Sequence, residues 1–357
     1  MTADVDKFFE SLKDENIQSV DDAINSWTGN INVISKSGKT PLMSCCKSAD
    51  KIKLLIKAGA DVNAKGENGI TALMTAISAE ITELLINLGA DVNARSTEGN
   101  TALMKAGSKD IISVLIANGA EVNAKNENNS TALMAKFINA GTTQLLIDSG
   151  ADVNAKNDDG FTALMGSYLG EITRLLISKG AELNTKDNEG NTAITYIFEK
   201  DYDAERAKIL EELIKAGADV NAVNNEKNIP LINLIISDFN RHDQEYLMEP
   251  LIKAGADINY AGREDRKTPL MLVTKMTQAQ ILLNAGADLT MRDIDGMLAH
   301  EQKHFNDSTD LKKIRSYLEN AHLTHSSLLQ EAHASVGTEN SSVTQVDNLL
   351  INKRERL

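Results

Sequence analysis

The chain has 357 residues, of which 42% are hydrophobic and 25% are charged, and its formal net charge is −14 at pH 7. Enough apolar side chains are present to form a packed core, which excludes a wholly disordered chain. The negative charge repels phosphate backbones and anionic lipid, so we do not expect nucleic acid as a partner.

The first 37 residues are predicted to form an N-terminal capping repeat. They carry two helical stripes of apolar side chains, at Val5, Phe8, Phe9 and Leu12 and then at Val20, Ala23 and Ile24. No basic segment followed by an apolar run opens the chain, and no run of 18 apolar residues occurs anywhere in it. We therefore expect neither a cleavable signal peptide nor a membrane span.

Two adjacent cysteines, Cys45 and Cys46, are the only ones in the sequence. Neighbouring cysteines rarely form a bond with each other, so no disulfide framework is expected and a reducing compartment is favoured. Both replace small residues of a repeated motif, which favours buried packing. The alternative is a reactive thiol.

A short internal repeat organises the chain between residues 38 and 295. Its most regular part is Thr-Ala-Leu-Met, at residues 71–74, 101–104, 131–134 and 162–165, with variants that begin at Thr40, Thr192, Ile229 and Thr268. An apolar cluster follows each copy, and then Gly-Ala-Asp or Gly-Ala-Glu. The glycines of that motif are Gly59, Gly89, Gly119, Gly150, Gly180, Gly217, Gly255 and Gly286.

Each part of the repeat has a physical role in a helix–turn–helix unit. Threonine is a good N-cap, because its hydroxyl accepts a hydrogen bond from a free backbone N–H of the first turn. The spacing of Ile81, Leu84 and Leu85 gives a second helix one apolar face. Gly89 can take the left-handed conformation that ends this helix. One such unit cannot bury its apolar face alone, so we expect the units to stack.

The pattern G-x-T-A-L-M followed by L-L-I-x-x-G-A-D-V-N-A resembles the ankyrin repeat, over roughly residues 31–321. The resemblance implies an all-α solenoid of stacked helix–turn–helix units with hairpin-like loops, here named fingers, and a concave groove that binds other proteins. It also implies that the asparagine of each Val-Asn-Ala motif is a structural residue within its loop. The short Thr-Ala-Leu-Met repeats are most similar to those of bacterial ankyrin proteins.

Repeat length departs from the family's usual period of about 33 residues. Up to Thr192 the motif begins at positions 40, 71, 101, 131, 162 and 192, and this shorter period predicts a short first helix. The period then lengthens twice, to Ile229 and to Thr268, and the extra residues fall around 199–203 and 240–245. We expect longer helices or protruding turns there. Methionine also usually replaces the family's histidine after Leu, which puts a hydrogen bond between neighbouring loops in doubt.

The end of the chain is predicted to hold a C-terminal capping repeat, residues 296–321, and a tail, residues 322–357. The repeat pattern fades after His322, so we expect the tail to be partly disordered. One short amphipathic helix is predicted at 342–350.

The same cap contains His-Glu-Gln-Lys-His at residues 300–304. On one helix this spacing would place His300 and His304 on one face, able to share Zn²⁺, with Glu301 as a general base. Lys303 lies between the histidines, and the end of a solenoid offers no dry cleft for a catalytic metal. We therefore favour a solvated capping helix over a zinc metallohydrolase.

Two sets of side chains are predicted to contact a partner protein. In the groove they are Thr75, Lys105, Phe137, Tyr168, Thr195 and Tyr196. On the fingers they are Glu67, Glu98, Glu127, Asp158 and Asn188. Because the fingers are mostly acidic or amide, we expect the partner to present a basic or hydrogen-bonding face. The aromatic column Phe137, Tyr168 and Phe198 either fills the core or forms an exposed ladder.

The sequence predicts a non-enzymatic scaffold for protein–protein interaction. It contains no glycine-rich phosphate loop, no Cys/His zinc cluster and no Ser-His-Asp grouping, and we expect no cofactor and a monomeric chain. The resemblance to bacterial repeats suggests a secreted effector that acts on a host protein. A cytoplasmic inhibitor or immunity protein is the alternative, and the zinc hydrolase remains the hypothesis from another class.

Overall fold

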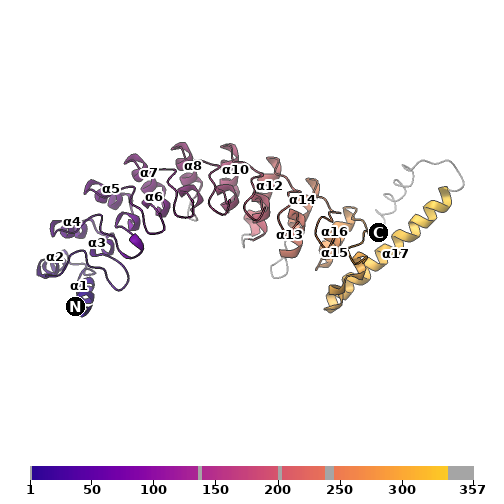
Figure 1. Ribbon diagram of the computed structural model, residues 1–357, viewed down its shortest axis with the longest axis horizontal. Coiled ribbons are helices and arrows are strands. Elements are labelled where there is room, and N and C mark those ends of the chain that lie inside the picture. The colour runs from indigo at the N-terminus through magenta and orange to yellow at the C-terminus, as the bar shows by residue number, and fades with distance from the viewer. Residues whose placement is uncertain (1, 136–138, 200–202, 238–244, 337–357) are drawn as a thin grey trace. The chain divides into compact units, whose positions relative to one another are not determined.

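A computed structural model describes residues 2–135, 139–199, 203–237 and 245–336. The chain divides into two compact units, the first of residues 1–167 and 171–182 and the second of residues 168–170 and 183–357. Every regular element in the described residues is a helix, which confirms the predicted all-α repeat fold (Figure 1).

The first unit begins with two helices, α1 (Thr2–Ser11) and α2 (Ile17–Ser26), and continues as pairs of a short and a longer helix (Figure 1). The pairs are α3 (Pro41–Ser44) with α4 (Ala49–Lys57), η2 (Leu73–Thr75) with α5 (Ala79–Asn87), α6 (Ala102–Lys105) with α7 (Lys109–Ala117), η3 (Ala132–Met134) with α8 (Ala140–Asp148), and α9 (Ala163–Gly166) with α10 (Gly170–Ser178). The first helix of each pair spans a single turn, as the short period predicts.

Threonine N-caps begin some of the short helices but not all. The hydroxyls of Thr40, Thr101 and Thr162 accept hydrogen bonds from the backbone N–H three residues later, at 3.3, 3.4 and 3.5 Å. Thr71, Thr131 and Thr192 precede η2, η3 and α11 (Ala193–Tyr196), and their buried hydroxyls have no hydrogen-bond partner in the described residues. The predicted side-chain cap is therefore wrong at these three positions.

The longer helices end as predicted, at glycines in the left-handed region. Gly59 has φ +91° and Gly89 has φ +93°. The N–H of the following alanine reaches back to the helix, so Ala90 donates to the carbonyl of Leu85 at 3.0 Å. This is the bond pattern that closes a helix when glycine takes the position after its C-cap.

The core of the first unit lies between successive helix pairs. Leu55, Leu85 and Leu115 occupy the same register in α4, α5 and α7, and each is at most 1% exposed. Cys45 and Cys46 are buried, as predicted, and the Cys46 thiol donates to the carbonyl of Leu42 at 3.2 Å. Burial raises the pKa of Cys45 to about 12, which opposes a reactive thiolate.

Asparagines of the Val-Asn-Ala motifs join neighbouring repeats. The side chain of Asn93 donates to the carbonyl of Gly119 at 2.9 Å and accepts from the backbone N–H of Glu121 at 2.9 Å. The same pair of bonds recurs in this unit at Asn63, Asn123 and Asn154. A structural role is confirmed, but each side chain bridges to the next repeat and does not act only within its own loop.

The second unit contains the longer repeats. Its elements are α11 (Ala193–Tyr196), η4 (Ile197–Glu199), α12 (Asp203–Lys215), α13 (Pro230–Ser237), η6 (Glu245–Leu247), α14 (Met248–Lys253), α15 (Pro269–Leu272), α16 (Met276–Asn284), η7 (Ala299–Glu301), η8 (Lys303–Asn306) and α17 (Thr309–Val336). With 13 residues in α12 and 8 in α13, the extra sequence lengthens the helices, as predicted. The turns at 200–202 and 238–244 lie outside the described residues.

Helix α17 runs for 28 residues and packs on η7 and η8 through the buried side chains of Ile314 and Leu318. The helix continues past residue 322, where we expect the tail to begin, and ends at Val336. Its sequence contains neither glycine nor proline, so nothing in the backbone stops it before Gly337. The predicted helix at 342–350 lies outside the described residues. None of the described helices has both the length and the apolar character needed to cross a bilayer.

Candidate partner-binding surface

After a finger at 35–39 that carries Lys36 and Lys39, four further fingers of the first unit are tight turns, at residues 66–70, 96–100, 126–130 and 157–161. In the second of these, Ser96 N–H donates to the carbonyl of Asn100 at 3.0 Å, and Gly99 N–H donates to the carbonyl of Ser96 at 2.9 Å. Gly99 has φ +74°, a conformation that glycine takes without strain. The turn therefore holds the two residues at its tip in a fixed position.

Backbone hydrogen bonds connect each finger to the one before it. Thr97 N–H donates to the carbonyl of Asn68 at 2.9 Å, Glu127 N–H to that of Glu98 at 2.9 Å, and Asp158 N–H to that of Asn128 at 3.0 Å. A Cβ atom on Gly99 would lie 2.8 Å from the amide nitrogen of Glu127, so this approach also requires glycine. The fingers form one hydrogen-bonded row in the first unit.

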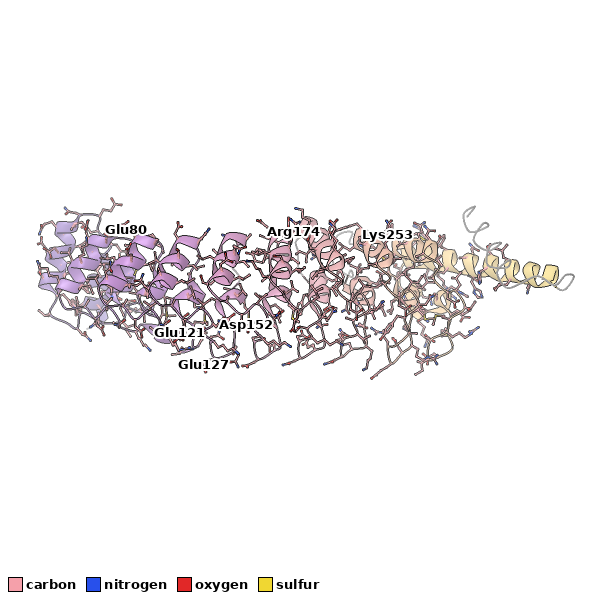
Figure 2. The ribbon with its side chains drawn as sticks, turned by 90° about the horizontal axis from the view of Figure 1, so that it is seen from above. Glu80, Glu121, Glu127, Asp152, Arg174 and Lys253 are labelled. Atoms are coloured by element: carbon pink, nitrogen blue, oxygen red, sulfur yellow. The ribbon has the colours of Figure 1, made fainter. Side chains whose placement is uncertain are left out.

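The predicted finger residues lie at the tips of this row. Glu67, Glu98, Glu127 and Asp158 are all exposed, while the four fingers carry no cationic side chain. Figure 2 shows Glu127 on the finger side of the first unit and Glu80, in α5, on the opposite side. The row is therefore an acidic edge on a fixed backbone. Asn188, in the second unit, is also exposed at its finger.

Two predicted groove residues lie at the ends of short helices in the first unit. Lys105 is exposed at the last position of α6. Thr75 is half-buried at the last position of η2, and its hydroxyl donates to the carbonyl of Ala72 at 2.9 Å. Both positions lie outside the core of the repeat, so their side chains can differ in size and charge from one repeat to the next.

Thr195 does not belong to this register. It is the third residue of α11, the position that methionine holds in other repeats, and it is only 4% exposed. Its hydroxyl donates to the carbonyl of Thr192 at 2.7 Å. Because Thr replaces Met in this repeat, the alignment of the motif is not obvious from the sequence. Tyr196, the last residue of α11, is the counterpart of Lys105, the last residue of α6. The half-buried phenol of Tyr196 donates to the carboxylate of Asp187.

The aromatic column does not form one exposed ladder. Phe198 is 1% exposed and fills the core, because η4 continues the first helix there. Tyr168 is half-buried, and Phe137 lies outside the described residues. In the short repeat at 71–77, η2 ends at Thr75 and the backbone of Ala76 is extended. Ile77, which occupies the position of Phe198, is therefore 60% exposed. The environment of this position depends on repeat length.

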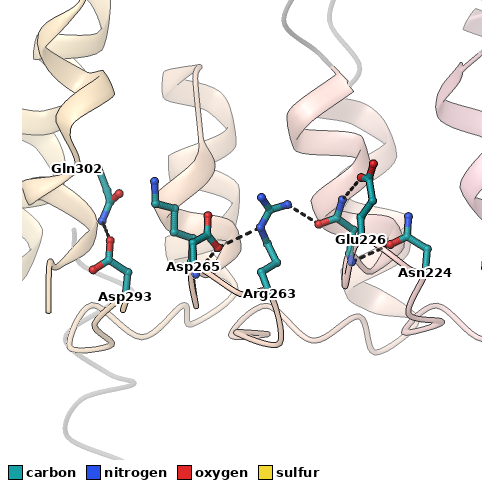
Figure 3. A network of polar contacts seen from close by, with 8 residues as sticks. Asn224, Glu226, Arg263, Asp265, Asp293 and Gln302 are labelled. Carbon is teal, nitrogen blue, oxygen red and sulfur yellow. Dashed lines mark hydrogen bonds and ion pairs between the residues drawn. The ribbon is translucent and has the colours of Figure 1, made fainter. Parts of the chain in front are cut away.

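Side-chain amides connect the fingers of the second unit, a feature that the sequence prediction missed. Asn224 donates to Asn191 at 3.0 Å and accepts from the backbone N–H of Asn228 at 2.9 Å. The Arg263 guanidinium then donates to Asn228 and, at 3.2 Å, to Asp265 (Figure 3). The signal in the sequence was an amide or acid at the first and last residues of the fingers at 187–191 and 224–228.

The His-Glu-Gln-Lys-His stretch does not form the helical zinc motif. His300 lies in η7 and His304 in η8, and Gln302 between them has an extended backbone. His304 Nε2 lies 3.3 Å from the carbonyl of Val273, while the ring of His300 lies 5.2 Å from that of His322. Burial lowers the pKa of His300 and of His304. In the described residues no three His, Cys, Asp or Glu side chains are grouped to hold a metal ion.

Comparison with known families agrees with this architecture. The family model described as "Ankyrin repeats (3 copies)" matches five overlapping windows, residues 11–96, 50–126, 77–157, 100–187 and 133–224. Together the windows extend over residues 11–224, more than half of the chain. No curated protein matches the sequence.

Proposed function

The chain belongs to the ankyrin repeat family, whose repeats are protein–protein interaction modules, and we propose that it acts without catalysis by binding a partner through its fingers and groove. The partner surface is proposed to be basic or rich in hydrogen-bond donors. The observation that carries this proposal is the acidic row of the first unit, at Glu67, Glu98, Glu127 and Asp158.

Two properties of this row favour binding. Three of the four residues, Glu67, Glu127 and Asp158, donate their backbone N–H to the preceding finger, so the backbone that carries these carboxylates is ordered before a partner arrives. Little conformational entropy is then lost on association. Carboxylates in successive repeats also attract a basic face, which raises the association rate and selects against acidic partners.

The groove residues are proposed to provide the second part of each contact. In the first unit these are Thr75 and Lys105, at the ends of their short helices. In the second unit the corresponding position is held by Tyr196, and half-buried Tyr168 lies two residues further along its repeat, in the register of Ile77. Aromatic side chains are enriched among residues that dominate binding energy. Thr195 is omitted because it is buried.

A paired crosslinking pull-down tests the acidic row. One variant replaces Glu98, Glu127 and Asp158 with their amides, and a control makes the same change at Glu80, Glu83 and Asp110 on the longer helices. Both remove three exposed charges, so a protein that binds the fingers is lost from the first variant and retained by the control. Equal capture by wild type and finger variant would remove the acidic row from the proposal.

We propose more specifically that the chain is a secreted effector that is delivered into a host cell. The similarity of the Thr-Ala-Leu-Met repeats to bacterial ones supports this role. Deletion of residues 340–357 should abolish translocation from the producing bacterium while leaving the repeats folded. Unchanged delivery would remove that role from the tail, and no delivery of the full chain would favour a cytoplasmic inhibitor or immunity protein.

A further inference from the structure

Two neighbouring fingers of the second unit, residues 224–228 and 263–267, have cations at a position that favours glycine. Lys227 has φ +63° and Arg266 has φ +55°. The residues in the same register of the other fingers are Gly38, Gly69, Gly99, Asn129, Gly160, Gly190 and Gly296. Asparagine tolerates this left-handed region, but a side chain such as lysine or arginine rarely adopts it.

The fold makes no use of these two side chains. Their backbone N–H groups close the turn, Lys227 to Asn224 and Arg266 to Arg263, both at 3.0 Å, as Gly190 does to Asp187 at the same distance. Both side chains are exposed, and within the described residues neither makes a hydrogen bond or an ion pair. Glycine would close these turns equally well and without strain. Unused cations in a strained conformation indicate a contact outside the chain.

The acids near Lys227 and Arg266 accept hydrogen bonds from other groups, so the two cations remain able to bind a partner. The carboxylate of Glu226 accepts from Asn228 at 3.1 Å, and that of Asp265 accepts from Arg263 and from the backbone N–H of Lys267, at 3.2 and 3.1 Å. Figure 3 shows these acids turned into the network between the fingers.

The remaining acid of the two fingers, Glu264, is exposed, and Lys267 is half-buried. The two fingers together carry Lys227, Arg263, Arg266 and Lys267 against three acids, whereas four fingers of the first unit, at 66–70, 96–100, 126–130 and 157–161, carry acids and no cation. The other finger of the first unit, at 35–39, carries Lys36 and Lys39, and Lys36 forms an ion pair with Asp6.

We propose that Lys227 and Arg266 bind a carboxylate-rich segment of a partner protein. Arginine offers a planar fork that matches a carboxylate, and lysine adds a second positive charge on a flexible stem. Adjacent repeats pack about 8–10 Å apart, and alternate side chains of an extended segment are about 6.5–7 Å apart. Acids two or three residues apart can therefore reach both cations. The inference concerns the second unit alone and does not depend on the acidic row of the first.

A fluorescent peptide of six glutamates, titrated into the full-length chain, tests the proposal. The double variant Lys227→Gly, Arg266→Gly should lose affinity by about tenfold or more. Its midpoint of thermal unfolding should stay equal or rise, because the left-handed strain is relieved. The double asparagine variant should show the same loss, since it keeps the conformation and removes the charges. A control, Lys253→Ser in α14, removes an exposed cation outside the two fingers and should bind like wild type.

Three outcomes would overturn the proposal. The first is that the wild-type chain does not bind the peptide, or that the double glycine variant binds it as tightly as wild type does. The second is an equal loss in Lys253→Ser, which would indicate nonspecific attraction. The third is binding to phosphatidylserine vesicles in preference to the peptide, which would assign the two cations to a membrane surface.

Discussion

The asparagine side chains that connect successive repeats by hydrogen bonds can be removed one at a time, and Asn93→Ala is the most direct test. The substitution removes two hydrogen bonds to the next repeat, both 2.9 Å long, to the carbonyl of Gly119 and from the N–H of Glu121. Each such bond contributes about 0.5–1.5 kcal/mol. The site is half-buried, so water can reach the released groups in part. We therefore expect the free energy of unfolding to fall by about 1–3 kcal/mol, the sum of two such bonds.

Urea unfolding followed by circular dichroism measures this change, with Asn87→Ala as control. Asn87 is exposed at the end of α5, and its side chain makes no hydrogen bond in the described residues, so its loss should change stability by less than about 0.5 kcal/mol. If Asn93→Ala costs no more than the control, the asparagines do not hold the repeats together. The double variant with Asn123→Ala should lose more than either single one.

Three further predictions concern the fingers, the thiols and the histidines. Gly99→Ala should destabilise the chain by more than Gly89→Ala, because both lose a left-handed glycine but only at Gly99 would a Cβ meet the next finger; equal unfolding midpoints in urea would contradict this. Burial favours the neutral thiol of Cys45 and of Cys46, so iodoacetamide at pH 8 should leave both unmodified in the native chain and label both in urea, as mass spectrometry can show. His300→Ala should not change the zinc content of the purified protein by metal analysis; loss of stoichiometric zinc would return the metallohydrolase to consideration.

Helices and their ends were predictable because they depend on local chemistry. Glycine after an apolar cluster marks the ends of the longer helices in eight copies, and threonine before an apolar pair marks where most of the short helices begin. The repeat spacing predicted either longer helices or protruding turns around 199–203 and 240–245, and α12 and α13 are longer helices. Such features need no knowledge of the neighbouring repeat.

Features that depend on a neighbouring repeat were harder to predict. Thr195 looked like a surface residue because methionine is replaced in its motif, and only the helix bounds restore the register. The amide network around Asn224 and Asn228 joins residues of successive repeats that are far apart along the chain, from Asn191 to Arg263. His300 and His304 have the spacing of a zinc motif, but two short 3₁₀ turns separate them. Spacing alone cannot distinguish those turns from one helix.

Hydrogen–deuterium exchange of the full chain, with and without a crosslink-validated partner, tests the central claim most directly. We predict slower exchange in the four acidic fingers of the first unit, at 66–70, 96–100, 126–130 and 157–161, and little change in α5, α7 and α8. Protection confined to the longer helices, with fingers exchanging as in the free chain, would contradict it.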